Sequence, residues 1–228
     1  MKMKFGALVT DGRGKIGGHV ASKNRGGAYL RTKVTPVNPQ TSYQNAARAR
    51  ITTFSQGWRG LTANQQAAWN SAVSNWQKTD IFGDLKNPSG INLYVRLNSN
   101  LSEAGQSAIA TPPLPNSVTN AVTATLTGAA GTPALSLAFT VSPIPAATTW
   151  IIRVTPQVSA GKSFVKSLYR NLNTQAAAVT TPINLLADYN TRFGTLVAGQ
   201  KVFVEIIAVS NTTGVKSTPI STFAVIAP

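Results

Sequence analysis

Cysteine is absent from this sequence of 228 residues, which also has one histidine and only six acidic residues. Without cysteine there are no disulfides, zinc–thiolate sites or thiol nucleophiles. Six carboxylates and one imidazole leave little material for a metal cage or a proton relay. We therefore expect no catalytic residue, no metal site and no cofactor, in a protein that is not an enzyme and takes no small-molecule substrate.

Long hydrophobic runs are also missing. The apolar stretch that follows Lys4 is broken by Gly6 and closed by Asp11, so it is too short for the core of a signal peptide. No run approaches the roughly 18 apolar residues of a membrane span. We expect the chain to be made in the cytoplasm of its cell and to have no membrane partner.

Positive charge, by contrast, is abundant and unevenly distributed. The formal net charge is +15; residues 1–60 hold 11 basic residues against Asp11 alone, which leaves +10 there. Residues 61–120 are neutral overall, and residues 121–228 carry +5. This asymmetry predicts an N-terminal part that meets an anionic partner, either nucleic acid or an acidic protein surface.

The first 36 residues predict a basic, glycine-rich β-meander. Strand-like runs at 4–10, 15–23 and 28–35 are separated by glycine-rich segments at 11–14 and 24–27. Such segments favour hairpin turns because their residues tolerate positive φ. Pro36 and Pro39 then end the sheet, since proline cannot donate a hydrogen bond to a ladder.

Residues 37–103 predict a helical hairpin and a short third helix. Two capping boxes, Thr41 with Gln44 and Thr62 with Gln65, begin helices expected over 42–60 and 63–78. Ser89 can cap the third helix. Apolar residues at helical spacing mark the expected core faces: Ala47, Ile51, Phe54, Trp58 and Leu61 on the first helix, and Trp69, Ala72, Val73 and Trp76 on the second.

The remaining chain predicts a linker and a β-sandwich. Residues 104–120 contain three prolines and no periodicity, which is typical of an extended linker between domains. From residue 121 to 228 apolar residues alternate with small polar ones in about seven runs, as in a sandwich. One helical turn is expected at 185–193. The fold class is therefore α+β and multidomain.

For three motifs, a specific functional interpretation is less favoured than an ordinary structural one. The glycines of residues 12–18 suggest a phosphate loop. A phosphate loop needs Ser or Thr directly after Gly-Lys and then a helix, and neither is present here, so a hairpin turn is favoured. His19, Asp11 and a serine could form a catalytic triad, but the sequence has no nucleophile elbow, so a surface or interface histidine is favoured. Trp58, Trp69 and Trp76 at helical spacing favour a core over an aromatic binding groove.

The candidate site is a set of basic residues on the meander and its turns. Flexible cations there can reach phosphates or carboxylates. Tyr29 is the only aromatic residue among them after Phe5, so the stacking platform of single-strand binders is missing. Docking on an acidic protein surface is therefore favoured over nucleic-acid binding and over a merely solvated basic face. The site residues are Lys15, Lys23, Arg25, Arg31 and Lys33.

Two parts of the sequence resemble known families. Residues 196–217 resemble the last two strands of fibronectin type III-like domains, which implies an Ig-like sandwich for residues 121–228. The N-terminal hundred residues are similar to a group of bacteriophage- and prophage-encoded proteins. That resemblance implies a virion-associated structural product without catalytic activity, and its motifs are residues 14–18, 27–31, 36–41, 58–62, 66–70 and 90–94.

Together these observations predict a bacteriophage virion structural protein anchored by its basic N-terminal part. A capsid-associated role, as a decoration or minor head protein, is favoured over a tail role. The alternative is a phage protein that binds nucleic acid through the basic segment. The expected partners are capsid or tail subunits, with a homo-oligomer as a further option. The expected location is the virion, after synthesis in the host bacterial cytoplasm.

Overall fold

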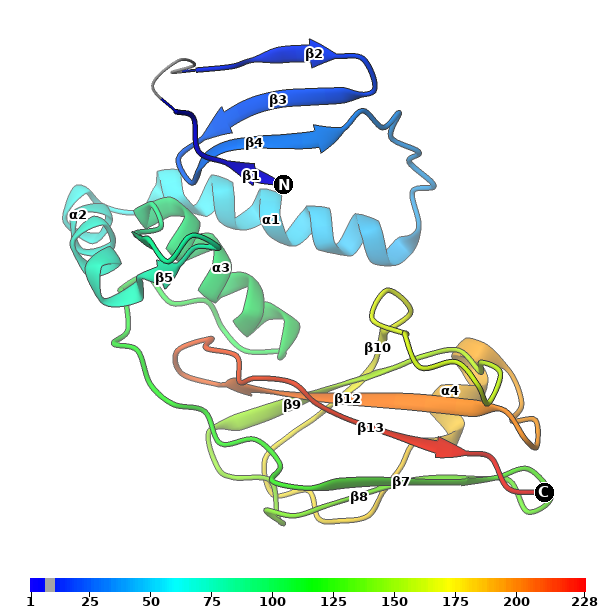
Figure 1. The fold of residues 1–228 in the computed structure, drawn as a ribbon. Coiled ribbons are helices and arrows are strands. Elements are labelled where there is room, and N and C mark those ends of the chain that lie inside the picture. The colour runs from blue at the N-terminus through cyan, green and yellow to red at the C-terminus, as the bar shows by residue number, and fades with distance from the viewer. Residues whose placement is uncertain (7–10) are drawn as a thin grey trace. The chain divides into compact units, whose positions relative to one another are not determined.

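A computed structural model of the chain describes residues 1–6 and 11–228 and divides it into two units, Met1–Leu93 and Tyr94–Pro228. Helices and antiparallel sheets occur in the same chain, which confirms the α+β class (Figure 1). No helix among the described residues is long and apolar enough to cross a membrane.

Unit 1 begins with a four-stranded antiparallel sheet. Its strands are β1 (Lys2–Met3), β2 (Gly14–Ile16), β3 (His19–Asn24) and β4 (Gly27–Thr32), in the order β1-β4-β3-β2. The meander differs from the predicted one because Gly17, with φ of 55°, and Gly18 form a turn inside the run expected at 15–23. Of the strand expected at 4–10, residues 7–10 lie outside the described residues.

Two helices follow at the predicted starts. Helix α1 (Ser42–Gly60) has the expected bounds, and the Thr41 hydroxyl accepts from the Gln44 amide at its start. Helix α2 (Ala63–Ala72) continues as a 3₁₀ turn, η1 (Val73–Trp76), two residues short of the predicted end at 78. Thr62 and Gln65 form a complete capping box, with bonds of 3.3 and 2.9 Å.

Burial in unit 1 is uneven. Trp69, Trp76 and Leu93 are buried, as are Ala21 and Ala28 of the sheet, whereas α1 has no buried residue at all. The core face expected on α1 is therefore at most half-buried. A short hairpin of β5 (Lys78–Thr79) and β6 (Leu85–Lys86) follows η1 and leads to helix α3 (Gly90–Glu103).

The structure divides the chain inside α3 and not at the expected linker. Residues 94–103 of α3 belong to unit 2, and residues 104–120 are held there by asparagine side chains. Asn98 is fully buried and bonds both backbone groups of Ile109, and Asn120 donates to the carbonyls of Ile206 and Thr218. The segment is thus attached to unit 2 at residues 109, 116 and 120.

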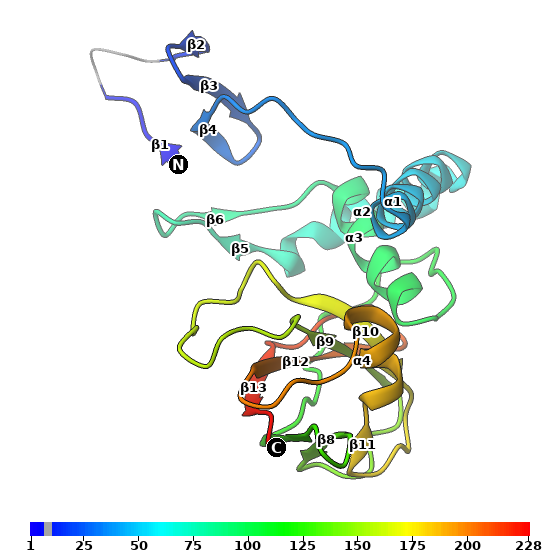
Figure 2. The same ribbon diagram turned by 90° about the vertical axis from the view of Figure 1, so that its right-hand side faces the viewer.

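Unit 2, which is described throughout, contains seven strands in two antiparallel sheets. One sheet has the order β11-β8-β7, and the other has the order β10-β9-β12-β13. Helix α4 (Leu186–Phe193), close to the expected helical turn, contacts a strand of each sheet (Figure 2). The strand bounds are Ala124–Ala129 (β7), Ala134–Phe139 (β8), Thr148–Val154 (β9), Arg170–Gln175 (β10), Ile183–Asn184 (β11), Lys201–Ser210 (β12) and Ile220–Val225 (β13).

The two sheets share one core. Alternate residues of β8, β9 and β12 belong to this core, as the period of two predicts. Most of β9 and the second half of β12 are buried on both faces. Trp150 of β9 is fully buried and meets Phe139 of β8 edge to face, with ring centroids 4.7 Å apart. Tyr189 of α4 is also buried, and its hydroxyl donates to the Thr155 carbonyl at 3.2 Å. This core positions the loops and the outer faces of unit 2.

Candidate functional site

Unit 1 concentrates the positive charge of the molecule. It contains 13 Lys and Arg against three Asp, which leaves +10, whereas unit 2 contains eight against three acidic residues, which leaves +5. The three aspartates of unit 1 all form ion pairs, but the cations that they contact are Arg13, Lys2, Lys4 and Lys86. None of these cations belongs to the predicted site.

The five predicted site residues are all exposed. None of them forms an ion pair within residues 1–6 and 11–228. An ammonium or guanidinium group in this situation is neutralised only by solvent ions or by a binding partner. The structure therefore leaves Lys15, Lys23, Arg25, Arg31 and Lys33 available to an anionic partner.

Strand register brings three of the five together on one face of the sheet. Lys15 of β2 lies opposite Val20 of β3, which lies opposite Arg31 of β4, so these side chains share a face. The Lys33 amide continues the ladder by donating to the Gly18 carbonyl at 2.8 Å, which places Lys33 on the same face as Arg31. Lys15 and Arg31 are two strands apart, or about 10 Å.

The other two predicted residues are not part of this basic face. Lys23 lies opposite Ala28, on the side of the sheet that carries the buried Ala21 and Ala28. Arg25 occupies the turn between β3 and β4. Sequence alone could not assign the five cations to the faces of the sheet, because a one-residue change in strand register would exchange the two faces.

Asp80 connects the sheet to the β5–β6 hairpin. It lies 3.8 Å from Lys2, and it accepts hydrogen bonds from the amides of Phe82 and Asp84. Burial opposes its ionisation, but these amides and the ammonium groups of Lys2 and Lys86 outweigh that effect and hold the pKa of the carboxyl below its ordinary value. The carboxylate thus contacts both β1, through Lys2, and the turn between β5 and β6.

Among the described residues, four further cations of unit 1 form no ion pair and were not in the predicted site: Lys78 of β5 and three arginines of α1. Arg48, Arg50 and Arg59 lie on α1, and none of them forms an ion pair among the described residues. Helix α1 has no acidic residue in its first turn and none elsewhere in its sequence. The signal that could have found them is the absence of any i,i+4 acidic partner along this helix.

The weaker interpretations can be compared with the structure. Residues 14–18 form β2 and a hairpin turn followed by strand β3, as favoured over a phosphate loop. His19 is exposed on β3, while Asp11 contacts Arg13 at 3.3 Å. Trp69 and Trp76 are buried, which confirms them as core, whereas Trp58 is only half-buried.

No family model matches this chain, and no curated protein matches it.

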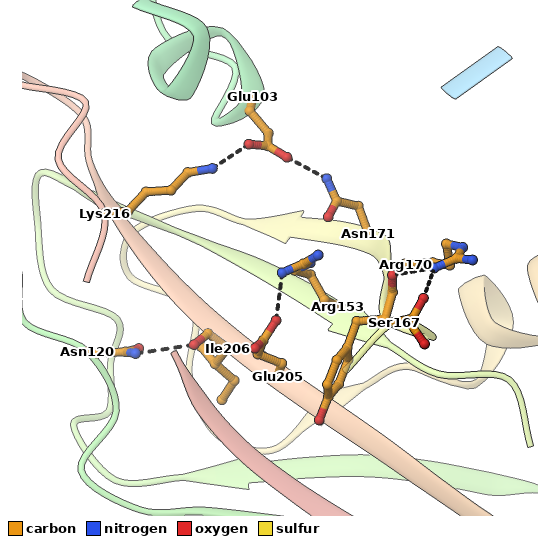
Figure 3. A network of polar contacts seen from close by, with 10 residues as sticks. Glu103, Asn120, Arg153, Ser167, Arg170, Asn171, Glu205, Ile206 and Lys216 are labelled. Carbon is orange, nitrogen blue, oxygen red and sulfur yellow. Dashed lines mark hydrogen bonds and ion pairs between the residues drawn. The ribbon is translucent and has the colours of Figure 1, made fainter. Parts of the chain in front are cut away.

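Unit 2 holds a polar network on the outer side of its four-stranded sheet (Figure 3). Glu103, in the last turn of α3, accepts from Lys216 at 2.5 Å and from Asn171 of β10 at 2.6 Å. Arg153 and Glu205, opposite each other on β9 and β12, form an ion pair at 2.8 Å. These contacts attach the end of α3 to the sheet, and they leave neither carboxylate unpaired.

A small open pocket of about 200 Å³ also lies in unit 2. Its lining is neutral, and some of its polar groups bond to one another: the Thr148 hydroxyl donates to the Pro145 carbonyl at 2.7 Å, and the hydroxyls of Ser210 and Thr212 lie 3.2 Å apart. Pockets for drug-sized ligands usually exceed this volume. Within the described residues no cluster of three His, Cys, Asp or Glu could hold a metal ion. The unpartnered cations of unit 1 are the stronger candidate site.

Proposed function

We propose that this chain is a non-enzymatic structural protein of a bacteriophage particle. It is associated with the capsid as a decoration or minor head protein, and its basic N-terminal part anchors it to other virion proteins. It is made in the host cytoplasm and ends in the virion. A position in the tail is the alternative within the same class.

One observation carries the anchoring role. Unit 1 has nine cations without an ion pair in the described part of the chain, while each of its three carboxylates is already paired. Clustered like charges repel each other and are stabilised when a partner supplies anions. A fixed acidic surface of a neighbouring subunit meets this need, and the resemblance of residues 14–97 to phage proteins supports a virion as its setting.

The same proposal assigns unit 2 an Ig-like or fibronectin type III-like sandwich that is displayed outward. Seven short strands in two antiparallel sheets, with one shared core, support it. The first, second and fifth of these strands share one sheet, and the other four share the second. A sandwich of this kind does not by itself fix a function.

Quantitative mass spectrometry of purified particles tests the proposed function. We expect the full chain in the virion at many copies, in a ratio to the major capsid protein that stays constant through density-gradient purification. Labelling of intact particles then separates a head from a tail position. Absence of the chain from washed particles would refute the structural role.

The second candidate function is binding of nucleic acid. It is favoured by the shared face of Lys15, Arg31 and Lys33, since cations about 10 Å apart can contact successive phosphates. If the five site residues clamped duplex DNA, log affinity would fall with log salt at a slope of roughly −4 to −5.

We expect instead that the full chain binds duplex DNA weakly and that binding is largely lost at about 0.2 M salt, because only screened surface charges are involved. Fluorescence anisotropy with a labelled duplex across a salt series measures both quantities. Tight binding at 0.15 M salt with the steep slope would favour the nucleic-acid role.

A further inference from the structure

The β5–β6 hairpin exposes three large apolar side chains within five residues. Ile81, Phe82 and Leu85 keep 71%, 42% and 64% of their surfaces exposed. We call these three residues the apolar tip. The hairpin extends away from α2 as a two-stranded ribbon (Figure 2). Exposed apolar residues that occur singly need no explanation, but a group of them rimmed by polar residues is typical of an interaction site.

The carboxylates of the same turn hold the apolar tip in place. Asp80, whose side chain is almost fully buried, accepts hydrogen bonds from the amides of Phe82 at 2.8 Å and Asp84 at 3.1 Å. Asp84 in turn lies 3.1 Å from Lys4 and 3.8 Å from Lys86. These contacts fix the backbone of the turn before any partner arrives. A partner that binds the tip therefore pays little conformational entropy for ordering it.

The lysines of the hairpin indicate an acidic partner. Lys78 and Lys86 lie directly opposite each other on the two strands. Like charges in this position destabilise a pair of strands. Lys86 contacts Asp84, whereas Lys78 forms no ion pair within residues 1–6 and 11–228. A partner carboxylate beside Lys78 would therefore relieve the repulsion between the two lysines.

The apolar tip distinguishes between the possible partners. Nucleic acid would supply anions, but the aliphatic Ile81 and Leu85 offer no ring on which bases stack. A second copy would bring another unit with a charge of +10. An anionic membrane would accept the apolar side chains, but the Asp84 side chain, which is 43% exposed in the same turn, would have to enter with them. A protein cleft can instead provide a donor for this carboxylate.

We propose that the hairpin inserts its apolar tip into a cleft of another protein, and that carboxylates at the rim of the cleft pair with Lys78 and Lys86. An apolar anchor at the centre of a contact, with charged groups at its rim, is the usual arrangement of a protein interface. This assignment rests on the proposed function, because it names the contact through which the basic unit 1 meets its partner.

Photo-crosslinking of the full chain, in the cells that naturally produce it, tests the assignment. Phe82 is replaced by the crosslinker benzoylphenylalanine, which keeps the aromatic ring. Phe164, an exposed aromatic residue of unit 2, is the matched control position. We expect a single protein adduct from position 82 that position 164 does not form. Mass spectrometry should find Asp or Glu beside apolar residues at the attachment point.

Two variants of the crosslinking chain separate docking from folding. Ile81→Ser with Leu85→Ser should lower the adduct yield about fivefold or more, because the anchor is lost. Lys78→Glu should lower it about threefold or more, because the new carboxylate repels an acidic rim. The same change places opposite charges across the strands, so the melting temperature of the free chain should not fall. Val34→Ser with Val37→Ser, two exposed apolar positions of unit 1 outside the hairpin, is the control and should leave the yield unchanged.

Three results would overturn the assignment: no discrete adduct from position 82, an adduct with nucleic acid or lipid, or a protein adduct whose yield ignores both hairpin variants. The proposed function fails separately. A variant-sensitive adduct with a protein that is not part of a virion would support the docking and contradict the proposed function. A chain that is present in particles but forms no variant-sensitive adduct would refute only the docking of the hairpin.

Discussion

Single asparagine side chains hold together segments that no helix or strand connects. Asn98 is fully buried, donates to the carbonyls of Tyr94 and Ile109, and accepts from the Ile109 amide at 2.7 Å. Each polar atom of this buried amide group therefore has a partner within the protein, and the same contacts satisfy the backbone of residue 109. A buried, fully bonded amide specifies one position of a segment that lacks regular structure.

Replacing Asn98 with Ala should therefore destabilise unit 2. The change removes three hydrogen bonds and leaves the Ile109 amide without its partner, which costs about 2–3 kcal/mol. Urea unfolding of the full chain, followed through the Trp150 core, measures the loss. Asn92→Ala, an exposed change on the same helix, is the control and should alter the unfolding free energy by less than about 0.5 kcal/mol. Equal effects of the two changes would contradict the role of Asn98.

Asp80 gives unit 1 a stability that depends on pH. Its pKa is held below the ordinary value of 3.8, so its stabilising contribution is complete above about pH 4 and is lost as the pH falls through the lower, folded-state value. Asp80→Asn should lower the melting temperature at pH 7, and the difference from wild type should shrink below pH 3.8. Thermal melts across this range test it, and a difference that is independent of pH would refute it.

At the scale of elements, the sequence predicted correctly those features that depend on contacts between residues close in sequence. The Thr62–Gln65 capping box and the span of α1 follow from bonds within four residues. The turn at Gly17 and Gly18 was missed because Asp11–Gly14 carries an equally strong turn signal, and pairing between strands decides between them. The apolar face of α1 was expected to be core but is at most half-buried, because periodicity marks an apolar face without saying how fully it is covered.

The prediction of a linker at 104–120 rested on a similar local pattern. Residues 104–120 lack periodicity, and proline suggested an exposed spacer, but the side chains that attach this segment come from residues far along the chain, such as Thr213 for Asn116. For the candidate site, the five predicted cations are all exposed. Their division between two faces of the sheet depends on register, which the sequence pattern did not determine.

Limited proteolysis distinguishes the two versions of the boundary. We expect the first cuts of the full chain in the segment 33–41, which is exposed at every residue and has no regular structure. Residues 104–120 should resist, because hydrogen bonds from Asn98, Asn116 and Asn120 hold them. Mass spectrometry identifies the fragments, and a stable product that starts within 104–120 would support the original linker.

Helix α2 is anchored by Trp69, which is fully buried. Trp69→Ala should destabilise unit 1 by about 3–5 kcal/mol, the usual cost of removing a buried large aromatic side chain. Chemical denaturation monitored by circular dichroism measures the loss. The half-buried Trp58 offers a comparison: Trp58→Ala should cost less. A melting transition unchanged by Trp69→Ala, with a loss of partner binding, would assign this residue to a binding site.

At the scale of the whole molecule, the net positive charge is concentrated in unit 1. Unit 1 carries two thirds of the net charge of +15, and its surplus cations lie on the sheet and on α1. Unit 2 carries a large apolar core and pairs Glu103 and Glu205 internally. This distribution of charge fits the proposed anchoring role, because an anchor needs a partner and a displayed domain must be stable alone.

Incorporation into particles of a variant that lacks the five cations of the predicted site tests this account most directly. The full chain with Lys15, Lys23, Arg25, Arg31 and Lys33 all changed to Gln is produced in place of the wild type, and its copy number in purified particles is measured by quantitative mass spectrometry. We expect a loss of about tenfold or more, with an unchanged circular dichroism spectrum, because the removed charges are exposed and unpaired. Incorporation at the wild-type copy number would contradict the anchoring role of the basic N-terminal unit.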